Sequence, residues 1–157
     1  MRLRRTRPSV EVAPGETTLA AAMTADGRPV AGTRDALYVP FRIPWEQLEA
    51  ADWDSETSTL RVSETDSEPF EVVLEPDEPR RLLELIRERV TASVVLQRHV
   101  PVAGGRGLRV IARRAPGRRD HLVWATRYDA GVDPDDPEVR RLAAEALTAA
   151  RADVGLD

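Results

Sequence analysis

Residues 32–62 read GTRDALYVPFRIPWEQLEAADWDSETSTLRV, and this stretch decides the expected fold. Short runs rich in β-branched and aromatic residues alternate there with Pro, Gly and polar turn residues, a pattern typical of short antiparallel strands. Pro40 and Pro44 should interrupt sheet pairing over residues 39–45, because proline has no N–H group to donate to a ladder. The upstream pair Asp26-Gly27 predicts a hairpin turn. Six strands are therefore expected, over residues 16–25, 28–33, 36–40, 45–54, 59–65 and 69–75.

A helix of about twenty residues is expected next, from near Asp77 to Gln97. Asp77 can cap the free amides of its first turn, where the missing N–H group of Pro79 costs little. Residues 90–97 are rich in β-branched side chains, so the chain could instead become extended there. The helix would close one open end of a curled sheet. Its apolar residues recur at three- and four-residue spacing: Leu82, Leu83, Ile86, Val90, Val94 and Leu96.

The last third of the chain predicts two more strands, over residues 107–115 and 121–129, joined by a loop over residues 116–120. A helix should follow, capped by Asp136, with Pro137 in its first position and Gly155 at its end. This ββα unit is small for independent folding, so it should pack on the first domain or on its counterpart in a dimer. The apolar face of the second helix is expected to hold Val139, Leu142, Ala146, Ala149 and Val154.

Three parts are therefore expected along the chain. Residues 1–15 form a flexible arm with four Arg residues, residues 16–98 form the sheet-and-helix domain, and residues 99–157 form the ββα extension. The fold class is α+β, with a curled antiparallel sheet, or partly open barrel, capped by a helix.

A family resemblance rests on the 32–38 turn and strand (GTRDALY), the 43–45 corner (IPW), the 60–62 strand (LRV) and the helix after them. With these features, residues 16–97 resemble the bacterial pleckstrin-homology-like (PH/GRAM-type) domains, in which a C-terminal helix closes a bent antiparallel sheet. The family has seven strands where six are expected here. The first hairpin carries Arg28 beside Asp26 and lacks the basic cluster of phosphoinositide-binding members, so no phosphoinositide site is implied. The whole chain is also similar to uncharacterised proteins of high-GC Gram-positive bacteria, which implies no activity.

Composition excludes several classes of chemistry. The chain has no Cys, which rules out disulfides, Cys-ligated zinc and thiol nucleophiles. It has no Lys either, which rules out Schiff-base chemistry and a P-loop lysine. No apolar run is long enough to cross a bilayer or to act as a secretory signal, so a cytoplasmic location is expected. No cofactor is expected.

Charge alternates in blocks along the chain. Residues 98–128 hold eight Arg and one Asp, whereas residues 46–97 hold fourteen acidic residues and five Arg. The basic block would either bind an anion or nucleic acid, or be neutralised by acidic blocks of the same chain or a second copy. Neutralisation is favoured because the pI of the whole chain is about 5.3. The candidate anion-binding residues are Arg106, Arg109, Arg113, Arg114, Arg118 and Arg119.

No set of residues commits the chain to a reaction. His99 and His121 have no metal ligand at local spacing. The acidic residues around Trp53 are better explained as a strand edge that resists aggregation than as an acid–base pair. Glycines 104, 105 and 107 precede a strand and allow the chain to reverse. We therefore expect a non-enzymatic interaction or adaptor domain that binds a protein partner or associates with itself. Anion or nucleic-acid binding is the alternative, and an enzyme of unknown type is third.

Overall fold

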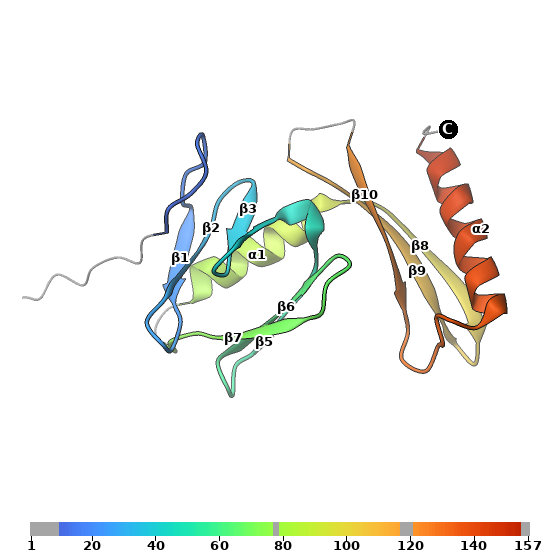
Figure 1. Cartoon of the computed structure of the whole chain (residues 1–157), viewed down its shortest axis with the longest axis horizontal. Helices are drawn as coiled ribbons and strands as arrows, with labels where there is room; N and C mark the ends of the chain where they lie inside the picture. Colours follow the sequence, from blue (N-terminus) through green and yellow to red (C-terminus); the bar gives the residue numbers. More distant parts are fainter. Residues whose placement is uncertain (1–9, 77–78, 117–120, 155–157) are drawn as a thin grey trace, which may run out of the picture. The chain divides into compact units, whose positions relative to one another are not determined.

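The computed structural model describes residues 10–76, 79–116 and 121–154. These residues form an α+β fold with three antiparallel sheets, none of which closes into a barrel (Figure 1). The chain divides into two compact units, with the change at Ser93 and Val94. Arg2, Arg4, Arg5 and Arg7 of the expected arm lie outside the described residues.

In the first unit, the described residues form seven strands in two sheets. The four-stranded sheet has the order β1 (Ala20–Met23), β2 (Pro29–Gly32), β3 (Ala36–Tyr38) and β4 (Arg42–Pro44). After the short 3-10 helix η1 (Trp45–Gln47), the three-stranded sheet has the order β5 (Leu48–Asp54), β6 (Thr59–Glu64) and β7 (Phe70–Val73). All neighbouring strands run antiparallel, as expected for a chain of hairpins.

Strand β4 corrects the expectation that the prolines interrupt pairing over residues 39–45. Ile43 pairs with Leu37 and Pro44 pairs with Ala36, so the chain re-enters the sheet after Pro40. Proline is tolerated in β4 because β4 lies at the edge of its sheet, where an N–H group need not be donated to a further strand. The described residues of the first unit therefore form seven strands and not six.

Helix α1 (Arg80–Ser93) packs against β1 and β2 and against β5 and η1 (Figure 1). Leu82 and Ile86 are buried in the core that it shares with the strands. The carbonyl of Pro79 accepts the first helical hydrogen bond, from the Leu83 amide at 2.9 Å, whereas the expected cap Asp77 lies outside the described residues. The helix ends at Ser93 instead of Gln97, because its β-branched continuation joins a sheet.

The part of the second unit that the structure describes has three strands and one helix, where two strands and a helix were expected. Strands β8 (Val94–Ala103), β9 (Arg106–Arg114) and β10 (Leu122–Tyr128) form a sheet in the order β10-β9-β8. Strand β8 begins in residues that were expected to end the first helix, with an extended chain as the alternative, and continues through residues to which no element was assigned. The missed strand supplies an edge of the sheet and part of its apolar face, through Leu96 and Val100.

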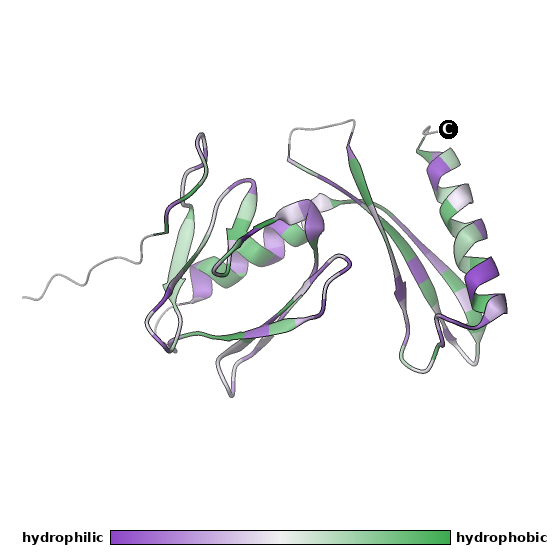
Figure 2. Ribbon diagram, in the orientation of Figure 1, coloured by the Kyte–Doolittle hydropathy of each residue, from purple (hydrophilic) through white to green (hydrophobic). Residues whose placement is uncertain are grey.

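Helix α2 (Pro137–Asp153) covers one face of this sheet by packing on β8 and β9. The expected cap is confirmed: Asp136 Oδ1 accepts from the amides of Glu138 at 2.9 Å and Val139 at 3.3 Å. Apolar residues recur along α2 between polar ones (Figure 2). Ala149 was expected on the apolar face of this helix, but it is exposed, and its neighbour Ala150 is buried instead. Gly155 lies outside the described residues.

Each unit has its own hydrophobic core. In the first unit, Trp45 is fully buried and its indole Nε1 donates to the Thr33 carbonyl at 2.9 Å, which fixes the corner between the two sheets. In the second unit, Leu108 and Val110 of β9 pack against Val139 of α2. The first core consists of Ala22, Val30, Leu37, Val39, Ile43, Trp45, Leu48, Leu60, Val62, Leu74, Leu82 and Ile86.

Candidate functional site

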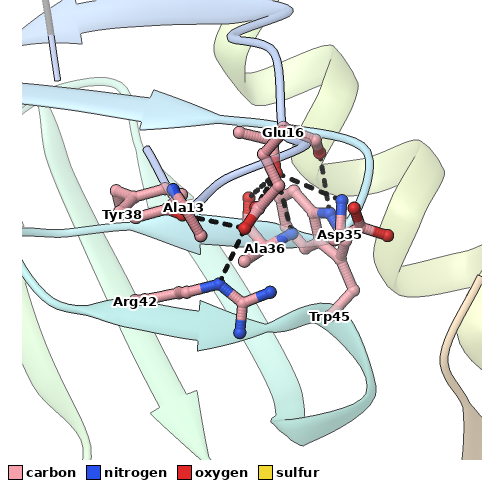
Figure 3. A network of polar contacts seen from close by, with 8 residues as sticks. Ala13, Glu16, Asp35, Ala36, Tyr38, Arg42 and Trp45 are labelled. Atoms are coloured by element: carbon pink, nitrogen blue, oxygen red, sulfur yellow. Dashed lines mark hydrogen bonds and ion pairs between the residues drawn. The ribbon is translucent and has the colours of Figure 1, made fainter. Parts of the chain in front are cut away.

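A buried carboxylate, Glu16, is the centre of a polar network in the first unit (Figure 3). Its side chain is 5% exposed. It accepts hydrogen bonds from the Thr33 hydroxyl at 2.6 Å, from the Tyr38 hydroxyl at 3.1 Å and from Arg42 Nε at 3.1 Å. The Tyr38 oxygen in turn accepts from the Ala13 amide at 2.9 Å. The network attaches the segment before β1, part of which was expected to be a flexible arm, to β3 and β4.

A buried carboxylate is a candidate acid or base, so its protonation decides its role. Burial alone would raise the pKa of Glu16, but hydrogen bonds from Thr33, Tyr38 and Arg42 lower it below the ordinary value of 4.5. An ionised carboxylate that three donors already satisfy is a poor general acid and has little capacity left for a substrate proton. We therefore assign the network to structure.

A groove of about 780 Å³ lies between α1 and the sheet of β5, β6 and β7. Leu60 of β6 and Ile86 of α1 are buried at its floor, and Trp53, Leu83 and Val90 are half-buried along it. The ends and rim are polar. The charged residues that line the groove are Asp52, Arg80, Glu84 and Arg87.

Strand β5 beside this groove lies at the edge of its sheet, since it pairs with β6 alone among the described strands. An edge strand presents backbone donors and acceptors to which another strand can pair. Asp52 and Asp54 are exposed on β5, as expected for an acidic edge, and Glu49 is half-buried. The groove thus combines an apolar lining with a backbone edge.

A second hollow of the first unit, about 420 Å³, lies between the β1–β2 hairpin, the turn before β4 and β7. Phe41 and Phe70 line it, with ring centroids 5.4 Å apart. Its hairpin carries Arg28, whose Nη2 lies 2.9 Å from Asp26 Oδ2. That guanidinium is therefore already paired with a carboxylate. The edge strand β7 also lines this hollow, but the carbonyl of Val73 in β7 already accepts a hydrogen bond from the Ala25 amide at 2.9 Å.

The structure separates the four described members of the six-Arg set predicted to bind an anion. Successive residues of a strand point to opposite faces. Arg109 and Arg113 therefore lie on one face of β9, whereas Arg106 and Arg114 lie on the other face, at its two ends. Arg113 is buried, and Arg106 lies against Gly131, where an added Cβ atom would be 2.2 Å from its guanidinium. Arg118 and Arg119 lie outside the described residues.

The two histidines do not meet. His99 is paired with Arg109 in the sheet, and Arg109 with Arg127, which is six residues along β10 from His121. At about 3.3 Å per residue this separates the two rings by roughly 20 Å. Within the described part of the chain, no three His, Asp or Glu side chains gather as metal ligands.

The acidic residues after β10 have structural partners. Asp129 Oδ2 accepts from the Gly107 amide at 2.8 Å, and Asp133 Oδ1 accepts from the Asp135 amide at 2.9 Å. Together with the cap formed by Asp136, these bonds explain the local concentration of carboxylates without a cation.

Sequence reasoning missed both Glu16 and the groove beside α1. The groove joins β5 to residues some thirty positions later, a pairing that local patterns do not contain.

None of the described helices is long and apolar enough to span a membrane. Comparisons with protein-family models, curated proteins and solved structures gave no match for this chain.

Proposed function

We propose that this chain is a non-enzymatic interaction module whose groove beside β5 binds an extended segment of a partner protein. One observation carries the proposal: an apolar groove of about 780 Å³ runs beside an edge strand, with α1 as its other wall. Addition of a peptide strand to a sheet edge is a common mode of recognition, in which the backbone gives affinity and side-chain pockets give specificity.

The architecture of the first unit supports a PH-like scaffold for this function. Four strands, then three strands, then a C-terminal helix follow one another along the chain. The resemblance implies seven strands and a closing helix, and the number of strands in the first unit matches. Scaffolds of this kind carry many functions, so the proposal depends on the groove and not on the fold.

The lining of the groove specifies the chemistry of the partner. Trp53, Leu83 and Val90 are half-buried, so apolar side chains at alternate positions of the bound segment would cover them. Asp52 and Asp54 lie on β5 and would face the other residues of the segment or its flanks. The preferred partner is therefore an extended segment with alternating apolar residues and basic flanks.

A matched pair of α1 variants tests the proposal. Thr91 lines the groove and is exposed, whereas its neighbour Ala92 is exposed and does not line it. A random peptide library displayed on phage would be panned against the full chain. Enriched peptides should bind Thr91→Trp at least roughly tenfold more weakly than the natural chain, and should bind Ala92→Trp unchanged. Hydrogen exchange should show added protection of the β5 amides when a peptide is bound.

Three results would overturn the proposal. These are a panning that enriches no peptide, enriched peptides that bind Thr91→Trp as tightly as the natural chain, and hydrogen-exchange protection that appears outside β5. A second copy of the chain is the other occupant that the groove could hold, and sedimentation at several concentrations tests for it. If the natural chain dimerised and Thr91→Trp did not, the groove would hold a second copy instead of a partner's segment.

A further inference from the structure

Three basic side chains form a row across the sheet of the second unit. His99 of β8 is paired with Arg109 of β9, and Arg109 is paired with Arg127 of β10. Residues paired in this way lie side by side on one face, with Cβ atoms about 5 Å apart. Leu108 and Val110, the neighbours of Arg109, pack in the core with α2, so the row lies on the sheet face opposite α2.

All three side chains of the row are exposed. Within the part of the chain that the structure describes, neither Arg109 nor Arg127 forms an ion pair or a side-chain hydrogen bond. Arg98, on the other face of β8, is by contrast paired with Asp153 of α2. Arg98 is thus neutralised on the α2 side, whereas no ion pair is described for the two Arg residues of the row.

Like charges directly opposite one another in a sheet are destabilising. The carboxylate beside the row belongs to Asp129, whose Oδ2 is 3.8 Å from His99 Nε2 and also accepts from the Gly107 amide at 2.8 Å. Asp129 follows Arg127 by two residues, but the described ion pair of its carboxylate is with His99 and not with either Arg. Two exposed Arg residues at paired positions therefore have no described carboxylate partner, an arrangement that an oxyanion would stabilise.

The geometry points to a binding site for a phosphate-type oxyanion at Arg109 and Arg127, flanked by His99. Guanidinium groups on neighbouring strands can converge on one tetrahedral anion, each with two parallel N–H donors. Trp124 and Tyr128 pack toward α2, so the described part of this face has no aromatic platform for stacked bases. An isolated phosphate group fits the row better than a single-stranded nucleic acid does.

Phosphate titration of the full chain, followed by nitrogen-15 NMR at constant ionic strength, tests this site. Inorganic phosphate should shift the Arg109 and Arg127 signals saturably, while chloride at equal ionic strength should not. Arg109→Gln and Arg127→Gln should each weaken phosphate binding roughly tenfold. Arg114→Gln is the matched control, because Arg114 is an exposed Arg of the same strand on the opposite face, and it should leave affinity unchanged.

Two ligands distinguish the sources of the phosphate group. A phosphoserine peptide that binds more tightly than inorganic phosphate, when its unphosphorylated twin does not bind, identifies a phosphorylated protein. Equal affinities identify a free phosphate compound. Because like charges oppose folding here, Arg109→Gln should also retain or gain stability toward urea in chloride while it loses the stabilisation given by phosphate.

Non-saturable shifts, equal phosphate affinity in Arg109→Gln, or equal weakening by Arg114→Gln would each overturn the site. If a thymidine oligonucleotide bound more tightly than phosphate, and Arg109→Gln lost that binding, the row would be a nucleic-acid surface instead of a phosphate site. Every residue of the row belongs to the second unit, so the result is independent of the Thr91→Trp test of the groove.

Discussion

Glu16 stabilises the first unit through its charge, and its removal should be measurable. Glu16→Gln keeps the shape but weakens the hydrogen bonds from Tyr38 and Arg42, so the free energy of unfolding near pH 7 should fall by about 1–3 kcal/mol. The pKa of Glu16 is lowered in the folded chain. Its contribution is therefore complete above the ordinary value of 4.5 and is lost as the pH falls below it. Urea unfolding near pH 7 and near pH 3 would measure both effects.

The same two measurements on Glu11→Gln provide the control, because Glu11 is exposed. This control should unfold like the natural chain at both pH values. A Glu16→Gln variant whose deficit stayed constant down to pH 3 would show that shape, and not charge, holds the network together.

Gly107 and Gly32 each lie close to a neighbouring group, which is backbone at Gly107 and a side chain at Gly32. A Cβ atom at Gly107 would lie 2.1 Å from the Val100 carbonyl oxygen of the neighbouring strand, whereas one at Gly32 would meet a terminal methyl of Leu85 at 2.7 Å. Backbone cannot move aside as a methyl group can. Gly107→Ala should therefore destabilise the chain by about 1–3 kcal/mol, and Gly32→Ala by less than about 1 kcal/mol. Urea unfolding of both variants would test the order, and the reverse order would contradict it.

At the scale of elements, the α2 cap offers a local test. Asp136→Ala removes the acceptor for the Glu138 and Val139 amides and should lower the free energy of unfolding by about 1 kcal/mol. Asp135→Ala removes an exposed ion pair with Arg140 and should cost less than about 0.5 kcal/mol. Chemical denaturation followed by circular dichroism would compare them. Equal losses would mean that the cap contributes nothing beyond surface charge.

The α2 start could be predicted from sequence because Asp136 and Pro137 act within one turn of each other. Strands β4 and β8 could not, for different reasons. Pro44 is compatible with β4 only because no described strand pairs on its far side, and local sequence does not show which strand is an edge. The Val94 region has β-branched residues at helical spacing, so the same residues fit a helix or a strand until a partner strand is known.

The candidate sites show the same limit. Block charge marks residues 98–128 as rich in Arg, and the strand period places Arg109 and Arg114 on opposite faces of any strand that holds both. Which of these faces α2 covers depends on tertiary packing, which local sequence does not show. The missing member of the row, Arg127, comes from β10. The expected hairpin, with its loop over residues 116–120, already implies that Arg127 pairs with Arg109, and the structure has this pairing.

At the scale of the whole molecule, two separate cores predict local responses to mutation. Leu108 is fully buried, and its cluster shares no residue with that of the first unit. Leu108→Ala should cost about 2–5 kcal/mol in its own core. Amide exchange should accelerate in β8, β9, β10 and α2 and keep its rate in β1 to β7. Leu60→Ala, in the first core, should give the opposite pattern, and uniform acceleration by either variant would mean one cooperative unit.

If the groove beside β5 binds a partner as proposed, the acidic side chains of β5 would also favour other proteins over copies of the chain itself. If two molecules met edge to edge through β5, Asp52 and Asp54 of one would approach the same residues of the other, and the repulsion would separate them. A foreign strand with Lys or Arg meets attraction at the same positions. The two carboxylates would thus disfavour self-association through β5 at high protein concentration. The double variant Asp52→Asn with Asp54→Asn should therefore self-associate through the same edge.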